Sequence, residues 1–343
     1  MIDWTTAILP CRHFELDADK VFKVSASGEV QWETACRIQV NGSYESSISV
    51  KSIDIDEREE GRTSHILISG NPSKFLQGHN VFGSDDILSL MLDVYLKITN
   101  ILDLPVSTED YLSVKAGEYP IKMIDINYSY GLPTRADVIS VIRALEFKSK
   151  TRHGRPSMKG GTLYWGQSSA RWALKAYSKG DEIEVKNHRL PLELTQTKLA
   201  HWADNKLRLE LRLKSKELID LGITQAKHLT TLKVQTLFNE YARRIDMHEQ
   251  IALSDTREHD IPTRLKSTYI LWKNGDDLRN ILARATYYRH RKELLQYGIN
   301  IDLREDKSPT RNVIPLIRIL EAKPASIPDW AFQEKLIHHS ARA

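Results

Sequence analysis

Strict alternation of leucines with charged residues over residues 206–214 is the strongest constraint that this sequence places on its fold. Successive side chains of a strand point to opposite faces, so a period of two predicts a β-strand. The leucines bury one face of that strand, and Arg208, Glu210 and Arg212 share the other. The segment therefore predicts a β-sheet with one apolar face and one polar face.

Two other segments predict strands that carry chemically useful side chains. Residues 122–127 place Asp125 between two isoleucines, so its carboxylate points away from the core that they enter. In residues 171–179 alternate positions share one face, and an acid follows just beyond the end of the segment. The shared positions and this acid are Lys175, Tyr177, Lys179 and Glu182. If the three strands lie in one sheet, its open face combines a tyrosine, a lysine beside it and three carboxylates.

Two interpretations of this polar face remain open. Three carboxylates suit a divalent metal ion such as Mg²⁺ or Mn²⁺, next to a phenol aimed at a phosphate. The alternative is an amphipathic sheet with solvated charges, because each strand taken separately is ordinary. In the first interpretation the metal ligands are Asp125, Glu182 and Glu210.

The order of the segments predicts an α+β fold with two domains. Strands are expected over residues 29–40, 47–55, 64–69, 111–115, 121–130, 162–166, 171–179 and 206–214, and helices over 85–102 and 135–147. Beyond residue 214 helical spacing prevails. We therefore expect an antiparallel-sheet domain over residues 1–217, followed by a smaller helical domain over residues 218–343.

Two basic stretches point to a polyanionic partner. The chain has 49 Lys and Arg against 45 Asp and Glu, a net charge of +4. Residues 148–179 nevertheless contain eight basic residues and no acid, and residues 264–292 contain eight against two acids. Aromatic residues inside both stretches suit stacking on bases, so the pattern favours nucleic acid over a merely solvated face.

Composition excludes several classes of protein. A hydrophobic content of 41% supports a real core and excludes general disorder. The sequence contains no run of about 18 apolar residues, which a transmembrane helix would require. Its first residues lack the basic region of a signal peptide. Two cysteines are too few for a disulfide framework. We therefore expect a soluble protein of the cytoplasm.

Several stretches resemble the replication proteins of the gene II/X type from filamentous bacteriophages. They follow one another from the first residue nearly to the last, and residues 74–83 form the most specific one. The Tyr-x-Lys-x-x-Glu and Arg-x-Glu patterns also resemble rolling-circle plasmid initiators of the staphylococcal type. One departure is Met123, where the family commonly has arginine. The matching stretches are Met1–Asp3, Lys74–Gly83, Ile124–Asp125, Ala176–Lys179 with Glu182, Leu207–Glu210, Asn312–Arg318 and Pro328–Trp330.

The resemblance implies initiation of rolling-circle replication in the host cytoplasm. Such a protein nicks the viral strand at the phage origin, becomes linked to the 5′ phosphate through a tyrosine, and later rejoins the displaced strand. In this sequence the implied nucleophile is Tyr177, aided by Lys179 and by Mg²⁺ or Mn²⁺ on the three carboxylates. The implied partners are origin DNA, as duplex and displaced single strand, and a host helicase and polymerase. The implied domains are a nicking and closing endonuclease over residues 1–217 and a helical DNA-binding domain over residues 218–343.

Three alternatives accompany this assignment. Tyr288 is a second candidate nucleophile, with Lys292 one helical turn away. His79 stands alone in an expected loop, where a surface position competes with a ligand or DNA-contact role. A non-catalytic origin-binding protein would share the basic surfaces, although it gains nothing from acids facing a phosphate. The expected DNA contacts are Arg171, Lys175, Arg208, Arg284, Arg289 and Arg291.

Overall fold

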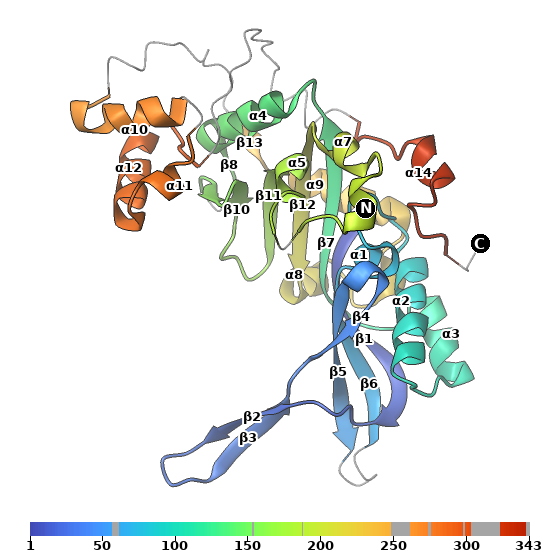
Figure 1. Ribbon diagram of the computed structural model, residues 1–343. Helices are drawn as coiled ribbons and strands as arrows, with labels where there is room; N and C mark the ends of the chain where they lie inside the picture. The colour runs from blue at the N-terminus through green and yellow to red at the C-terminus, as the bar shows by residue number, and fades with distance from the viewer. Residues whose placement is uncertain are drawn as a thin grey trace.

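A nine-stranded antiparallel sheet forms the centre of the described part of the chain (Figure 1). The computed structural model describes residues 1–56, 62–152, 154–186, 188–247, 261–273, 276–297, 299–302 and 323–340. The order across the sheet is β4-β5-β6-β1-β7-β12-β11-β10-β9. In that order the strands run over Ile38–Asn41, Ser47–Asp56, Arg62–Gly70, Ile2–Phe14, Ile121–Gly131, Lys206–Lys214, Trp172–Ser178, Thr162–Trp165 and Ser157–Lys159.

The three strands with functional side chains are neighbours in one sheet, which fulfils the condition on which the shared polar face depends. β12 lies between β7 and β11, and its four leucines are at most 1% exposed. In this register Glu210 lies opposite Lys175 on β11 and Asn127 on β7, while Arg212 lies opposite Asp125. Directly opposed residues share a face of the sheet. The polar side chains of all three strands are therefore brought together.

Helices cover the apolar face and form one core with it. α2 (Ile87–Ile101) begins after Asp86, whose carboxylate accepts hydrogen bonds from two backbone amides of its first turn. α4 (Arg135–Lys148) begins with a capping box between Thr134 and Asp137. Both helices confirm the expected segments. The other helices packed beside the sheet are α1 (Pro72–Gln77), α3 (Thr108–Ala116), α5 (Lys179–Glu182), α6 (Leu192–Thr195), α7 (Leu199–Ala203), α8 (Ser215–Asp220) and α9 (Thr231–Ala242).

One local prediction is wrong, and the sequence expectations omit one strand. The expected strand at 111–115 is part of α3, because Ser107 caps its first turn and Gly117 ends it in the left-handed conformation at φ 75°. β1 is a strand that the sequence expectations leave out, and it contains Pro10, although proline is rare in central strands. A shift in the pairing of β1 with β6 between Pro10 and His13 accommodates the proline.

The division between sheet and helical parts falls later than residue 217. The core under the sheet includes the apolar side chains of α8 and α9 and continues to Ile245. A separate apolar cluster begins at Ile261 and contains three helices. Residues 323–340 lie beside the sheet again, and α14 (Asp329–Gln333) lies on the side of the molecule opposite this cluster (Figure 1). The three helices of the separate cluster are α10 (Thr263–Lys273), α11 (Leu278–Ile281) and α12 (Arg284–Gln296).

Short elements complete the described part. β8 (Ser149–Lys150) pairs with β13 (Asp246–Met247). β2 (Lys20–Val24) and β3 (Val30–Ala35) form a hairpin that projects from the body (Figure 1). The remaining helices are the 3₁₀ turns η1 (Ser43–Glu45) and η3 (Ala226–His228). None of the described helices has the length and apolar character to cross a membrane.

Candidate active site

Tyr177 lies near the end of β11, on the polar face of the sheet. Its hydroxyl donates a hydrogen bond to Oε2 of Glu210 at 3.3 Å, and only 8% of the residue is exposed. Burial, and then the negative charge of Glu210, raise the pKa of the phenol well above its ordinary value. The hydroxyl is therefore neutral at rest and needs a base in contact with it to act as a nucleophile.

Glu210 occupies the position of such a base. Its carboxylate is buried, with 3% of the residue exposed, and forms an ion pair with Lys175 on the neighbouring strand. Burial, and then the negative charge of Asp125, raise the pKa of the Glu210 carboxyl to about 7. A carboxyl that titrates near neutral pH suits both accepting a proton from a phenol and returning it.

Lys179 lies in the same region but does not continue the strand. β11 ends at Ser178, whose side chain caps α5, and Lys179 is the first residue of that helix. Its fully buried ammonium lies 2.8 Å from Oδ1 of Asn80 and forms an ion pair with Glu182. Burial lowers the pKa of Lys179 to about 8, although Glu182 opposes the shift. The expected strand face shared by Lys175, Tyr177 and Lys179 is thus corrected for Lys179.

Asp125 is held by basic side chains on β12 and β11. Nε and Nη2 of Arg212 donate to its two oxygens at 2.7 and 2.5 Å, and Lys175 lies 3.8 Å away. This bidentate pair has good geometry for a buried carboxylate. Arg212 therefore neutralises Asp125 in a chain that has Met123 where the gene II type commonly has arginine.

The three carboxylates expected to bind metal do not fit a common metal site in this arrangement. Asp125 is paired with Arg212, Glu210 with Lys175, and Glu182 with Lys179. Over the described residues, no three His, Cys, Asp or Glu side chains gather closely enough to hold one metal ion. Each of the three acids instead has a cationic partner at hydrogen-bonding distance.

Asp3 and Asn80 belong to this cluster and were missed as site residues. Oδ1 of Asp3 accepts hydrogen bonds from Asn71 at 2.7 Å and from Asn80 at 3.0 Å. Burial, and then the charge of Glu210, raise the pKa of Asp3. Both residues lie in segments that carry the family resemblance, Met1–Asp3 and Lys74–Gly83. That resemblance was the available signal, but neither segment shows a periodic pattern that assigns a role.

Arg208 is a structural residue, which corrects its expected contact with DNA. The side chain is fully buried, and its Nε donates to Ser129 Oγ at 3.0 Å. Its two other nitrogens donate to the backbone oxygens of Asn80 and Val81 at 2.6 and 2.7 Å. Arg208 therefore ties the loop that carries Asn80 to the sheet.

The C-terminal segment holds the same loop from the other side. His79 is buried, which rules out the surface position among its two alternatives. Its Nε2 lies 2.8 Å from the backbone oxygen of Leu336. Burial lowers the pKa of His79 to about 4, so the ring is neutral. The amide of His338 donates to Gln77 Oε1 at 2.9 Å. Residues at opposite ends of the chain thus fix the position of Asn80.

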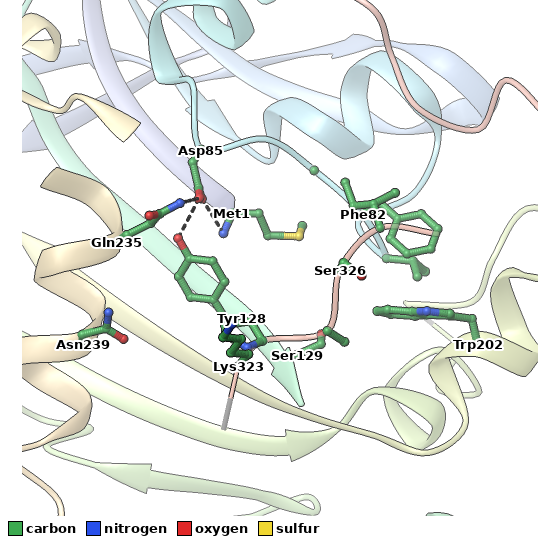
Figure 2. A pocket seen from close by; sticks show the side chains of 15 residues that line it. Met1, Phe82, Asp85, Tyr128, Ser129, Trp202, Gln235, Asn239, Lys323 and Ser326 are labelled. Atoms are coloured by element: carbon green, nitrogen blue, oxygen red, sulfur yellow. Dashed lines mark hydrogen bonds and ion pairs between the residues drawn. The ribbon is translucent and has the colours of Figure 1, made fainter. Parts of the chain in front are cut away.

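A cavity of about 460 Å³ lies next to this loop, where β1 begins (Figure 2). The α-amino group of Met1 forms an ion pair with Asp85 at 2.7 Å, and Tyr128 and Gln235 donate to the same carboxylate. Phe82, Trp202 and residues 323–327 line the other side. Tyr177, Glu210 and the charged side chains around them do not line it. The cavity is therefore separate from the candidate active site.

The remaining expected DNA contacts divide into paired and exposed side chains. Arg171 forms ion pairs with Glu217 and Asp220, and Lys175 is paired with Glu210 as described. Arg291 is paired with Asp302 and donates to the backbone oxygen of Met158 at 3.1 Å. The two expected contacts that lie exposed on the helical cluster are Arg284 and Arg289.

The two candidate nucleophiles have opposite environments. Tyr177 is buried against a carboxylate, whereas Tyr288 is 56% exposed on α12 and touches the ring of Tyr287. A tyrosine nucleophile needs a base in contact with it and fixed charges in a site from which water is excluded. This geometry favours Tyr177.

Comparisons with known proteins identify relatives over nearly the whole chain. The family model for the N-terminal region of the phage replication-associated protein, the gene II protein, matches residues 1–240. The model for the C-terminal region of the same protein matches residues 253–337. The replication-associated protein of Enterobacteria phage I2-2 is 47% identical over 96% of this chain and 95% of its own. That of Enterobacteria phage M13 is 23% identical over 77% and 76%.

A solved structure of a rolling circle replication initiator protein from Geobacillus stearothermophilus overlaps more weakly. Its TM-score is 0.33 at 11% identity, over 75% of this chain and 89% of that one. The sequence matches define the class as phage replication initiators and confirm the resemblance to the gene II type. The chain belongs to the family of phage replication-associated proteins of the gene II type.

Proposed function

We propose that this rolling-circle initiator cuts one strand of the phage origin by attack of Tyr177 on a backbone phosphate. The observation that carries the proposal is the contact between the Tyr177 hydroxyl and Glu210, at 3.3 Å inside a buried cluster. Membership of the replication-associated protein family supports origin DNA as the substrate. The host helicase and polymerase stay predictions of the family resemblance.

The chemical step is a transesterification. The phenol oxygen bonds to phosphorus, the bond from phosphorus to the 3′ oxygen breaks, and the strand stays linked to Tyr177 through its 5′ phosphate. Glu210 takes the phenol proton, and the departing 3′ oxygen gains a proton from solvent. Rejoining reverses these bonds. A 3′ hydroxyl releases its proton to solvent as its oxygen bonds to phosphorus, the bond from phosphorus to the phenol oxygen breaks, and Glu210 returns its proton to the phenol oxygen.

Basic side chains around the pair supply the electrostatic part of the mechanism. Lys175 holds Glu210 by an ion pair, and its charge lies next to the base rather than in bulk solvent. Lys179, Asn80 and Asp3 form a hydrogen-bonded chain that positions the start of α5 directly after Tyr177. Fixed charges in a desolvated site stabilise a developing negative charge more strongly than mobile water does.

A nicking assay with a mapped adduct tests this assignment. Supercoiled origin plasmid and labelled origin oligonucleotide are incubated with wild type, Tyr177→Phe and the matched Tyr288→Phe variant. We expect open circles and a phosphotyrosyl peptide containing Tyr177 from wild type and Tyr288→Phe, and neither from Tyr177→Phe. An adduct on Tyr288 would overturn the assignment, and no adduct from wild type would favour a non-catalytic origin-binding protein.

The Mg²⁺ or Mn²⁺ requirement stays a prediction from the sequence. The proposed step is written for the protein groups that the structure describes, in which Glu210 and Asp125 each have a cationic partner. Nicking by wild type in excess EDTA, compared with added Mg²⁺ or Mn²⁺, measures the requirement directly. Full activity in EDTA would end the metal prediction and leave the Tyr177 assignment unaffected.

A further inference from the structure

One face of α12 presents a continuous row of exposed side chains without an acid. The exposed positions recur at helical spacing, so they lie along one side of the helix over its whole length. We call this row the α12 stripe. It consists of Arg284, Ala285, Tyr288, Arg289, Lys292 and Gln296.

The charged side chains on the opposite face of α12 form ion pairs within the protein. Tyr287 and Leu294 are buried in the cluster of the three helices. Asp302 is shared by Tyr287, Arg279 and Arg291, and the one acid of the helix, Glu293, is paired with Arg264 at 2.8 Å. These acids near α12 are thus already neutralised. The positive charge of the α12 stripe remains directed to solvent.

The helical cluster is attached to the sheet at defined points. The guanidinium of Arg143 on α4 lies 4.5 Å from the ring centre of Trp272 on α10. Asn300 donates to Glu146 of α4, and Arg291 donates to the backbone of β9 at Met158. A ligand bound to the α12 stripe is therefore held at a set position relative to the sheet.

We propose that the α12 stripe enters the major groove of duplex origin DNA and reads its sequence. This deepens the proposed function, since it rests on origin DNA as the substrate. An α-helix with its side chains is about 10–12 Å wide and matches a major groove about 12 Å wide. Residues 282–283 alone join α11 to α12, so α12 follows a short turn and its first residues are held close to α11.

The residue types of the α12 stripe divide the work. Arg284 and Arg289 neutralise phosphates on the two sides of the groove, a contact that positions the helix and carries no sequence information. Lys292 and Gln296 suit the base-edge acceptors of guanine and the donor–acceptor pair of adenine. Tyr288 lies one helical turn before Lys292 and offers both a ring and a hydroxyl.

Binding of the full chain to labelled duplexes tests the proposal. Anisotropy titrations over a range of salt compare the origin duplex, a scrambled duplex and the origin single strand. The variant Arg284→Ala/Arg289→Ala/Lys292→Ala removes three charges from the α12 stripe. The matched control Lys122→Ala/Lys186→Ala/Lys216→Ala removes three exposed charges elsewhere.

We expect the stripe variant to reduce the log–log salt slope of duplex binding by about 2 to 3, and the control by less than about 1. Tyr288→Ala/Gln296→Ala should keep the slope and lower the preference for origin over scrambled duplex by about tenfold or more. An unchanged slope and preference would overturn the proposal. Equal losses on single strand and duplex would also overturn it and would instead assign the stripe to single-stranded DNA.

The outcome is separable from that of the proposed function. Adduct formation on a single-stranded origin oligonucleotide reports the chemistry of Tyr177 without duplex recognition. The stripe variants should keep this adduct and lose duplex selectivity, whereas Tyr177→Phe should lose the adduct and keep duplex selectivity. Normal selectivity in every stripe variant, with a normal adduct, would refute the α12 proposal alone.

Discussion

The cluster around Tyr177 and the α12 stripe both depend on charge, but they use it in opposite ways. In the cluster Asp125, Glu182 and Glu210 are each paired with a cation, and Asp125 and Glu210 are almost fully buried. On the α12 stripe the cations face solvent, and the nearby acids are bound to other residues. The cluster therefore suits the proposed chemistry, and the α12 stripe suits the proposed binding of a polyanion.

The difference has a physical reason. A nucleophile of high pKa needs a base and fixed charges in a site with little water, and such a site requires internal neutralisation to fold. A DNA-binding surface gains affinity by releasing counterions from phosphates, so its cations must stay unpaired until DNA arrives. Side chains that are already paired, such as Arg171 and Arg291, therefore contribute less to binding than their sequence pattern suggests.

Removing the base from the cluster should have the largest effect. Glu210→Gln keeps the shape but cannot accept a proton, so nicking should fall by about 10²- to 10⁴-fold. In wild type the rate should rise with pH through about 7, because Glu210 acts as a base only when ionised. The variant should lose this dependence and keep duplex binding, as measured by nicking rates from about pH 5.5 to about 8.5, on either side of that pKa.

Asp125→Asn is the matched control for that change. It removes the negative charge that raises the pKa of Glu210, so the rise of the nicking rate should move to lower pH without disappearing. Equal loss of nicking in both variants would contradict the assignment of Glu210 alone as the base.

Breaking the pair between Arg212 and Asp125 should have the next largest effect, a loss of stability. Arg212→Met leaves a carboxylate that is 1% exposed without its bidentate partner, which costs about 3 kcal/mol or more in free energy of unfolding. Urea unfolding near neutral pH measures the change. The double variant Asp125→Asn/Arg212→Met should recover most of it, and a loss below about 1 kcal/mol in the single variant would show that Lys175 suffices.

These residues also show how far sequence reasoning reaches. Alternation over residues 206–214 correctly predicted the strand and the side chains on its polar face, because one strand's pattern determines which side chains share a face. The pattern leaves open which strands lie beside it, and this follows from the structure. The pattern also did not predict that Lys175 and Arg212 would neutralise the acids, because those pairs depend on the register between strands. Contacts distant in sequence were equally invisible, such as that of His79 with Leu336.

His79, which contacts the C-terminal segment, should make the stability of the protein depend on pH. The pKa of its ring is about 4 in the folded protein and about 6.5 in the unfolded chain, so only the unfolded state binds a proton between these values. Stability should therefore fall as pH decreases from about 6.5 towards about 4, by roughly 3 kcal/mol from this residue. Denaturant unfolding at each pH gives the free energy of unfolding of wild type and of His79→Gln, and the difference between the two isolates the effect. His228→Gln, which changes an exposed histidine, is the control. The same pH dependence in His79→Gln would contradict it.

A single arginine on each side of α12 should give the smallest effect and the sharpest form of the comparison. Arg284→Ala removes an exposed charge of the α12 stripe, so the log–log salt slope of duplex binding should fall by about 0.9, with little change in stability. Arg291→Ala removes a cation that is bound to Asp302 and to the backbone of Met158. It should leave the slope nearly unchanged and lower the thermal stability of the helical cluster. Equal slope changes in the two variants would mean that Arg291 leaves Asp302 to reach DNA, and that paired and exposed cations in this protein are not functionally distinct.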